Sequence, residues 1–212
     1  MKYKYIFWDW NGTLFNDTAT CHLITNQLLK EMDLPEIELD YYRKKLRHPI
    51  KEFYREIITD DKDRGYEWFA DRFHEIYELK RIECKLHDFA EDCIDYIKSK
   101  NGLQSILSAH PQNLLDSIIA HLSIGHHFTH IIGASDNLAA AKFREGETLM
   151  KLHNADPGRA VLIGDTQHDA EVAEMLGIDC ILVAQGMQCK TRLSGLAYPI
   201  IDSLQELKAF LE

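Results

Sequence analysis

The sequence predicts an α/β fold: a parallel sheet flanked by helices on both faces, with an inserted α-helical bundle. Two observations predict it. Short apolar runs of strand length alternate with helical patterns from residue 88 onward, and one such run stands alone near the N-terminus. Between them, residues 16–87 have no strand-like run and repeat their apolar residues at helical spacing. With 212 residues, 45 % of them hydrophobic, the chain is long enough to bury a core of this kind.

The predicted strands are short apolar runs, and several end in a polar residue or a glycine. They cover residues 5–9, 105–108, 130–133, 160–164 and 180–184, with a weak sixth candidate at 198–201. Helical patterns separate the later strands and cover residues 88–100, 111–122, 145–153 and 170–176. Pro111 suits the first turn of a helix, and Gly177 suits the position just after a helix end. Because strands and helices alternate, the strands are expected to run parallel.

The inserted segment is predicted to be a bundle of about four helices, with its clearest breaks at Leu34-Pro35 and at Asp60–Gly65. An insertion directly after the first strand is expected to lie over the carboxyl ends of the strands, where an α/β sheet binds its ligand. We therefore predict two domains. Residues 1–15 and 88–212 form an α/β core domain, and residues 16–87 form a helical cap domain.

Charge and cysteine content argue against several classes of function. The net charge of −10 disfavours a nucleic acid or an anionic membrane as partner, and no apolar run has the length of a membrane span. The five cysteines are scattered without a CxxC pair, and the N-terminus enters a strand without a signal-peptide pattern. We therefore expect a reduced, cytoplasmic protein that is a monomer or a homodimer.

Two predicted strands end in acidic residues. The first strand ends at Asp9 and is followed by Trp10-Asn11-Gly12-Thr13, and a later strand ends in Gly164-Asp165, with Asp169 four residues further on. Because the carboxyl ends of parallel strands meet at one edge of a sheet, these carboxylates are expected to converge. Converging carboxylates suit a hard divalent cation, and one of them can serve as a nucleophile.

These motifs resemble those of the haloacid dehalogenase superfamily, specifically its phosphatase-like members with a helical cap after the first motif. The first motif of that family, D-x-D-x-T, stands here as Asp9-Trp10-Asn11-Gly12-Thr13. The second is a strand ending in Ser or Thr, here Ser108, and the third is a lysine some twenty-odd residues before the fourth, here Lys142. The fourth, G-D-x-x-x-D, stands as Gly164-Asp165 with Asp169. The resemblance covers nearly the whole chain and implies a Rossmann-like core.

The resemblance also implies a chemistry, namely Mg²⁺-dependent hydrolysis of a small phosphorylated metabolite through an aspartyl-phosphate at Asp9. Similarity to the phosphoglycolate-phosphatase-like branch suggests a small anionic substrate. Asp9 and Asp165 would be side-chain ligands of Mg²⁺, and Asn11 would contribute its backbone carbonyl. Asp169 would hold a metal-bound water or complete the coordination shell.

The remaining motif residues would contact the phosphoryl group. By the same resemblance, Ser108 would donate a hydrogen bond to a phosphoryl oxygen, and Lys142 would neutralise charge near Asp9. Thr13 would orient the loop, and Gly12 would let backbone amides approach the phosphate. Read alone, Ser108 also suits the start of the following helix as an N-cap.

Asn11 is the departure from the family pattern, because family phosphatases carry a second acid there, which protonates the leaving group and activates water. An amide cannot shuttle a proton, and the loss of a positioned acid typically lowers a rate by ~10²–10⁴-fold. Three enzymatic explanations stay open: a slow or specialised phosphatase whose leaving group needs little protonation, a proton supplied by a cap residue such as His48, or cleavage of a carbon–phosphorus or carbon–halogen bond. A catalytically impaired phosphate-binding protein is the alternative from another class. Arg47 and His48 lie between two predicted cap helices, where they either reach the substrate or form a solvated turn.

Overall fold

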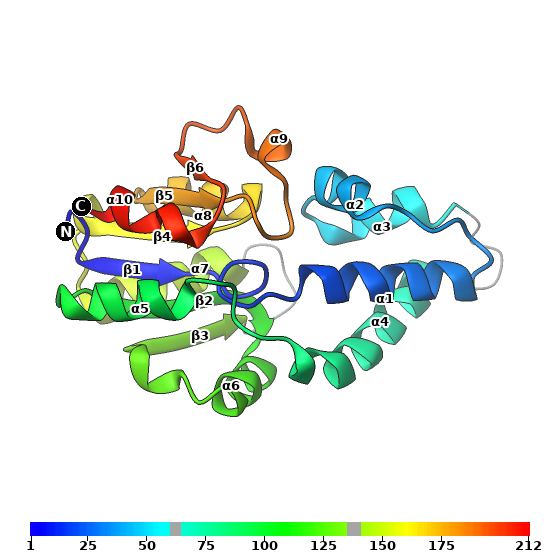
Figure 1. Ribbon diagram of the computed structural model, residues 1–212, viewed down its shortest axis with the longest axis horizontal. Helices are drawn as coiled ribbons and strands as arrows, with labels where there is room; N and C mark the ends of the chain where they lie inside the picture. Colours follow the sequence, from blue (N-terminus) through cyan, green and yellow to red (C-terminus); the bar gives the residue numbers. More distant parts are fainter. Residues whose placement is uncertain (60–64, 135–140) are drawn as a thin grey trace.

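The computed structural model describes residues 1–59, 65–134 and 141–212, and its centre is a six-stranded parallel sheet (Figure 1). The strands are β1 (Tyr5–Trp8), β2 (Leu103–Pro111), β3 (His130–Ala134), β4 (Ala160–Gly164), β5 (Asp179–Val183) and β6 (Ile200–Ile201). Their order across the sheet is β3-β2-β1-β4-β5-β6, and each neighbouring pair is parallel. The predicted α/β fold is therefore confirmed, including the weak sixth strand.

Helices cover both faces of this sheet, and the alternation along β1 shows why. Ile6 and Trp8 belong to one apolar cluster, while Tyr5 and Phe7 belong to another, because successive side chains of a strand point to opposite faces. The first cluster is completed by α5 (Ala90–Ser99), α6 (Gln112–His121) and α10 (Leu207–Leu211). The second is completed by α7 (Ala141–His153) and α8 (Gln167–Leu176). Central strands buried on both faces read as continuous apolar runs, which is what the sequence contains.

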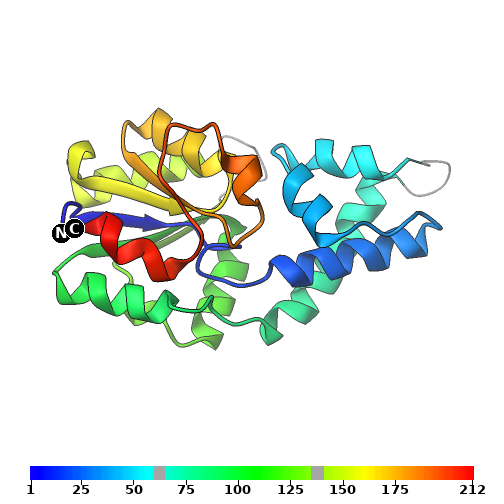
Figure 2. The ribbon, with the colours of Figure 1, turned by 45° about the horizontal axis from the view of Figure 1, so that its top comes forward.

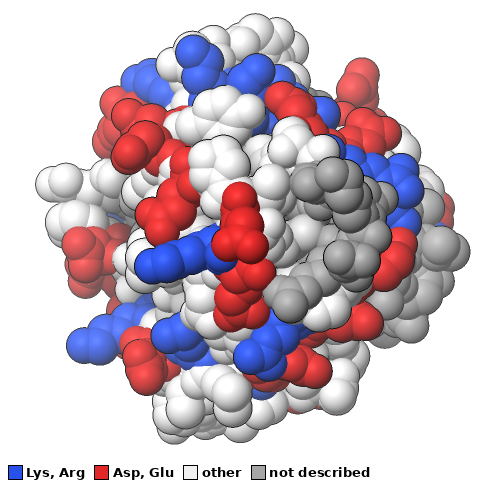
Figure 3. Space-filling model, turned by 90° about the vertical axis from the view of Figure 1, so that its right-hand side faces the viewer, with Lys and Arg blue, Asp and Glu red and all other residues white. Residues whose placement is uncertain are grey.

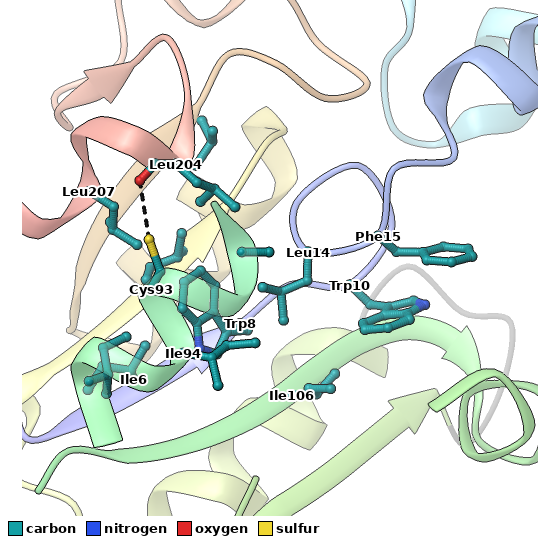
Figure 4. Close-up of a cluster of buried hydrophobic side chains, with 14 of the residues drawn as sticks. Ile6, Trp8, Trp10, Leu14, Phe15, Cys93, Ile94, Ile106, Leu204 and Leu207 are labelled. Carbon is teal, nitrogen blue, oxygen red and sulfur yellow. Dashed lines mark hydrogen bonds between the residues drawn. The ribbon is translucent and has the colours of Figure 1, made fainter. Parts of the chain in front are cut away.

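Figure 4 shows part of the first cluster. Trp8, Ile94 and Cys93 all belong to it, and the Sγ of Cys93 lies 3.2 Å from the backbone oxygen of Leu204. The same cluster continues into the loop after β1, where the rings of Trp10 and Phe15 stack with their centroids 5.0 Å apart. The loop that follows β1 is therefore anchored in the core.

Several element boundaries differ from the predicted ones by a few residues. β2 continues to Pro111, so α6 begins one residue later than predicted. α7 begins at Ala141 instead of residue 145. α8 begins at Gln167 instead of residue 170, because the Asp169 carboxylate accepts hydrogen bonds from the N–H and hydroxyl of Thr166 and closes the first turn. Short elements complete the chain: η1 (Arg81–Glu83), η2 (Gly125–His127), η3 (Pro157–Arg159), α9 (Lys190–Leu193) and η4 (Leu204–Glu206).

The inserted segment forms the expected helices, which lie beyond the carboxyl ends of the strands (Figures 1 and 2). They are α1 (Thr18–Glu31), α2 (Leu39–Lys45), α3 (Ile50–Ile57) and α4 (Tyr66–Lys80), and we call them the cap. Their apolar residues form a cluster of their own. The break predicted over residues 60–65 lies almost entirely outside the described residues, and the division into two domains stays a prediction.

The cap contacts the core through the loop after β5. Arg43 on α2 donates hydrogen bonds to the backbone oxygens of Gly186, at 2.8 Å, and Ala184, at 2.5 Å. In return, the Gln188 side-chain amide donates to the backbone oxygen of Leu46 at 2.9 Å. These bonds hold α2 against the same edge of the sheet at which the acidic motifs end.

The surface of the cap end carries charges of both signs, although the net charge of the chain is −10. On the end of the molecule formed by the cap, basic and acidic side chains are interspersed among the described residues (Figure 3). In the described chain, no helix combines the length and apolar character needed to cross a bilayer.

The cap core offers a matched stability test on α1. Leu29 is fully buried in the cap cluster, whereas Leu23 is 64 % exposed. We expect Leu29→Ala to lower the free energy of unfolding by ~2–5 kcal/mol, because it removes apolar contacts and leaves a cavity. Leu23→Ala should change it by less than ~0.5 kcal/mol. Urea titration followed by circular dichroism measures both, and equal effects would contradict the assigned faces of α1.

Candidate active site

Three carboxylates converge at the carboxyl edge of the sheet. Asp9 follows β1, Asp165 follows the neighbouring strand β4, and Asp169 lies in the first turn of α8. One carboxylate oxygen from each lies within 4.8 Å of the others, and all three residues are buried. Asp9 and Asp165 are thus brought together because β1 and β4 pair in register, with Trp8 opposite Ile163.

Lys142 lies between two of these acids. It is in the first turn of α7, is 3 % exposed, and its Nζ forms ion pairs with the carboxylates of Asp9 and Asp169. The lysine predicted as the third motif therefore reaches the acidic cluster. A single buried cation faces three buried acids here, so the site carries an excess of negative charge.

The pKa values of the acids follow from this excess. Burial raises the pKa of Asp9 to about 6, although the charge of Lys142 opposes the shift. Burial and the charges of Asp9 and Asp169 raise the pKa of Asp165 well above its usual range. Burial acts on Asp169 too, but the charge and hydrogen bond of Lys142 outweigh it and lower its pKa. Asp165 is thus the acid least compensated by the protein.

The groups that contact Asp165 are uncharged and do not neutralise its carboxylate. One of its oxygens accepts the Met187 N–H at 2.5 Å, and the other accepts the Thr13 hydroxyl at 3.0 Å. Gly12, at a φ of +77°, and Gly186 press against the same carboxylate, so that a Cβ at either position would overlap it. Three hard oxygen donors with one lysine are a donor set that fits a divalent cation.

Thr13 and Gly12 have defined contacts in the loop after β1. The Thr13 hydroxyl lies between Asp165, at 3.0 Å, and Asp9, at 3.2 Å. The Gly12 N–H donates to the backbone oxygen of Phe15 at 2.8 Å and to Asp17 at 3.0 Å. The Gly12 N–H is therefore occupied, and the need for glycine comes from its positive φ and its contact with Asp165.

Ser108 lies at the same edge of the sheet. It belongs to β2, and because Trp8 pairs with Ile106, Ser108 lies level with the loop after β1. Its Oγ accepts the His110 N–H at 3.0 Å, which leaves the hydroxyl hydrogen available for another acceptor. The alternative that Ser108 caps the next helix is wrong, because Pro111 occupies the N-cap position of α6.

The side chain of Asn11 forms its hydrogen bonds with two residues outside the group of three acids. Its Nδ2 donates to Oδ2 of Asp17 at 2.7 Å and to the hydroxyl of Tyr77 at 2.8 Å. Sequence reasoning missed Asp17 and Tyr77. An aspartate directly before a helix is typical of an N-cap, yet Asp17 makes no such bond, and Tyr77 follows the same helical spacing as the cap core.

The two candidate residues of the cap differ in position. The His48 ring stacks on His168, next to Asp169 in sequence, with centroids 4.8 Å apart, so His48 lies where the cap meets the acidic site. Burial and His168 lower the pKa of His48 to about 4. Arg47 forms ion pairs with Glu56 at 2.7 Å and Glu52 at 3.9 Å, within the cap.

Comparison with known proteins finds a matching family model and several similar proteins. Residues 6–183 match the family model described as haloacid dehalogenase-like hydrolase. The phosphoglycolate phosphatase of Aquifex aeolicus is 24 % identical over 186 residues, which cover 86 % of this chain and 85 % of that protein. The phosphoglycolate phosphatase of Pseudomonas putida is 20 % identical over 195 residues, with 86 % and 70 % covered.

Solved structures share the fold. A haloacid dehalogenase-like hydrolase from Streptococcus pneumoniae superposes with a TM-score of 0.84 at 21 % identity, covering 100 % of this chain and 99 % of that one. CbbY from Rhodobacter sphaeroides, in complex with phosphate, superposes with a TM-score of 0.71 at 16 % identity, covering 97 % and 96 %.

The raised pKa of Asp9 predicts a pH dependence of stability. An acid whose pKa is 3.8 unfolded and about 6 folded holds its proton more tightly in the folded state, so its contribution to stability is lost as pH rises across this interval. In EDTA, Asp9→Asn should therefore gain stability relative to the wild type, on the order of 2–3 kcal/mol, between pH 4 and pH 7. Urea titrations across this range measure the difference, and a constant difference would contradict the raised pKa.

Proposed function

The chain belongs to the haloacid dehalogenase-like hydrolases, and on that premise we propose that it is a Mg²⁺-dependent phosphatase. It hydrolyses a small phosphorylated metabolite through an aspartyl-phosphate at Asp9. The observation that carries the proposal is the convergence of Asp9, Asp165 and Asp169 around Lys142 at the carboxyl edge of the sheet, beneath the cap. The relatives named phosphoglycolate phosphatase support a phosphate monoester as substrate.

Asp9 acts as the nucleophile. Its oxygen on the side away from Lys142 forms a bond to phosphorus while the bond from phosphorus to the leaving oxygen breaks. Lys142 holds the other side of the Asp9 carboxylate and brings positive charge close to the incoming anion. Ser108 donates its available hydroxyl hydrogen to a phosphoryl oxygen. These residues bind and orient a tetrahedral anion against Asp9.

Mg²⁺ would be held by Asp9 and Asp165, by the backbone carbonyl of Asn11, and by Asp169 directly or through water. When bound, it supplies the positive charge that reduces repulsion between Asp9 and the phosphoryl oxygens. The Thr13 hydroxyl, which lies within hydrogen-bonding distance of both the Asp9 and Asp165 carboxylates, fixes their relative positions. The excess negative charge of the site supports this assignment.

The cap covers the site and limits access of water. His48, stacked on His168, lies where the non-reacting part of a substrate would pass, and we propose that it contacts the substrate. Arg47 would have to leave its two glutamates to do the same. All five cysteines are free, which supports a cytoplasmic location.

The alternative of carbon–phosphorus cleavage finds less support. In the members of the superfamily that cleave carbon–phosphorus bonds, a lysine of the cap forms a Schiff base with the substrate. Among the described residues Lys142 is the one buried lysine, and it comes from the core and is paired with two acids. Ester hydrolysis therefore remains the better account of the site.

The activity test uses p-nitrophenyl phosphate with Mg²⁺, because its leaving group departs as a stable anion. We expect turnover by the wild type and a loss of roughly 10⁴-fold or more in Asp9→Asn, which lacks the nucleophile. The matched control is Asp116→Asn, at an exposed site on α6, which should keep the wild-type rate. Turnover that survives in Asp9→Asn, or its absence in the wild type, would refute the proposed mechanism.

Metal binding has a readout of its own. Because a cation would relieve the repulsion among three buried acids, Mg²⁺ at 100 times its dissociation constant should stabilise the fold by about 2.7 kcal/mol. Thermal unfolding with Mg²⁺ and with EDTA measures this shift. Asp165→Asn should abolish most of it, whereas Asp116→Asn should retain it. An unchanged melting temperature in the wild type would mean that the acids hold no cation.

A further inference from the structure

Asp17 is a second buried acid close to the catalytic loop. It directly precedes α1 and is fully buried, but its carboxylate does not cap that helix. Oδ1 accepts the Gly12 N–H at 3.0 Å. Oδ2 accepts the Asn11 amide at 2.7 Å and the Tyr77 hydroxyl at 2.6 Å. The carboxylate therefore faces the catalytic loop on one side and the cap on the other.

The hydrogen bonds make Asp17 an acceptor on both oxygens, and although burial raises the pKa of Asp17, the bonds from Tyr77, Asn11 and Gly12 oppose that shift. A backbone N–H and an amide NH₂ can only donate, so Asp17 must be the acceptor on both of its oxygens. Within the described residues, no lysine, arginine or histidine forms an ion pair with Asp17. Hydrogen bonds from neutral donors therefore favour its ionised form, because such bonds are stronger when the acceptor is charged.

These hydrogen bonds hold the Asn11 amide against Asp17 and Tyr77. Its Nδ2 lies 2.7 Å from Oδ2 of Asp17 and 2.8 Å from the Tyr77 hydroxyl. An amide nitrogen engaged by two acceptors is poorly placed to donate to the oxygen of a leaving group, and an amide cannot transfer a proton. Both its contacts and its residue type therefore make position 11 unsuited to proton transfer.

Asn11 and Asp17 are also matched electrostatically. A carboxylate at position 11 would place its oxygen where Nδ2 now lies, 2.7 Å from Oδ2 of Asp17. Two buried carboxylates at that separation cannot both be ionised. The amide at position 11 therefore suits a loop that carries its second carboxylate at position 17.

Asp17 and Tyr77 also link the loop after β1 to the two segments that connect the cap to the core. Asp17 lies at the start of the first cap helix, and Tyr77 lies in the last full turn of α4, which leads back to the core. Next to them, the Asn16 N–H donates to the backbone oxygen of Lys85 at 2.9 Å. The Asn11 amide is therefore held by contacts made with the cap in the position seen here.

We propose that Asp17 is a positioning residue that, with Tyr77, withdraws Asn11 from proton transfer, and that the enzyme consequently selects phosphorylated substrates whose leaving group departs as a stable anion. Acyl phosphates and aryl phosphates form this class, and simple alkyl phosphates do not. The inference rests on the phosphatase function proposed above and narrows its substrate class.

The chemistry balances without an acid at position 11. In the first step an Asp9 oxygen bonds to phosphorus, and the leaving oxygen takes the electron pair of the broken bond and departs unprotonated. In the second step a water oxygen bonds to phosphorus, the electron pair of the Asp9–phosphorus bond returns to the carboxylate, and the water proton passes to a phosphate oxygen or to solvent. Because no group at position 11 accepts that proton, hydrolysis of the aspartyl-phosphate becomes the slow step.

The first experiment needs only the wild type. Acetyl phosphate, p-nitrophenyl phosphate and ethyl phosphate are compared with Mg²⁺ present. We expect kcat/KM for ethyl phosphate to be at least ~10²-fold below that for either of the others, and rapid mixing with p-nitrophenyl phosphate to release a burst of nitrophenolate stoichiometric with enzyme. Comparable rates for all three would overturn the inference and point to another proton donor, such as the cap residue His48. Turnover of none of them would instead refute the phosphatase function.

The second experiment exchanges the two side chains. Asn11→Asp alone should lower the melting temperature and leave ethyl phosphate hydrolysis no faster, because two carboxylates then meet. The double variant Asn11→Asp, Asp17→Asn keeps one acid and one amide in contact, so it should recover the melting temperature and raise ethyl phosphate hydrolysis by roughly 10²-fold. An equal gain in Asn11→Asp alone would show that Asp17 does not govern position 11. If the double variant does not fold, the Asn11→Asp variant and the comparison of three substrates with the wild type still test the inference.

Discussion

The repulsion among three buried carboxylates that share one lysine is the constraint on which the rest of this site depends. Asp9, Asp165 and Asp169 come from two neighbouring strand ends and one helix start, and Lys142 compensates two of them directly. Such an arrangement is unfavourable for an empty protein and favourable for one that binds a cation and then an anion. The fold tolerates it because paired strands and stacked helices buried on both sides hold the three acids in place.

The loop after β1 connects this charged centre to the cap. Its aromatic residues are packed in the core, its glycine lies against Asp165, and its asparagine is bonded to a residue at each end of the cap. Substrate access, cation binding and the side chain at position 11 are therefore parts of one connected structure. The same contacts give a physical reason for Asn11, since a neighbouring carboxylate at position 17 makes an uncharged side chain the stable choice there.

Specialisation by leaving group follows from this reasoning and fits the retained residues. Asp9 is paired with Lys142, and Ser108 keeps a hydroxyl hydrogen available at the same edge of the sheet. A protein that had lost all catalysis would not need an acidic cluster whose members repel each other. Position 11 lacks a group that can transfer a proton, and the loss of this group matters least for substrates that release a stable anion.

The fold class, the helical insertion and most element positions could be predicted from the sequence alone. They follow from hydrophobic periodicity, which depends only on residues close together in the chain. The sequence also sufficed to place Asp9 and Asp165 at one edge, since adjacent parallel strands end together. The first residues of α7 and α8 could not be predicted in this way, because side chains of the site itself stabilise the first turns of these helices. The partners of Asn11 could not be predicted either. Asp17 resembles an N-cap and Tyr77 a core residue until the chain brings them within hydrogen-bonding distance across sixty positions of sequence.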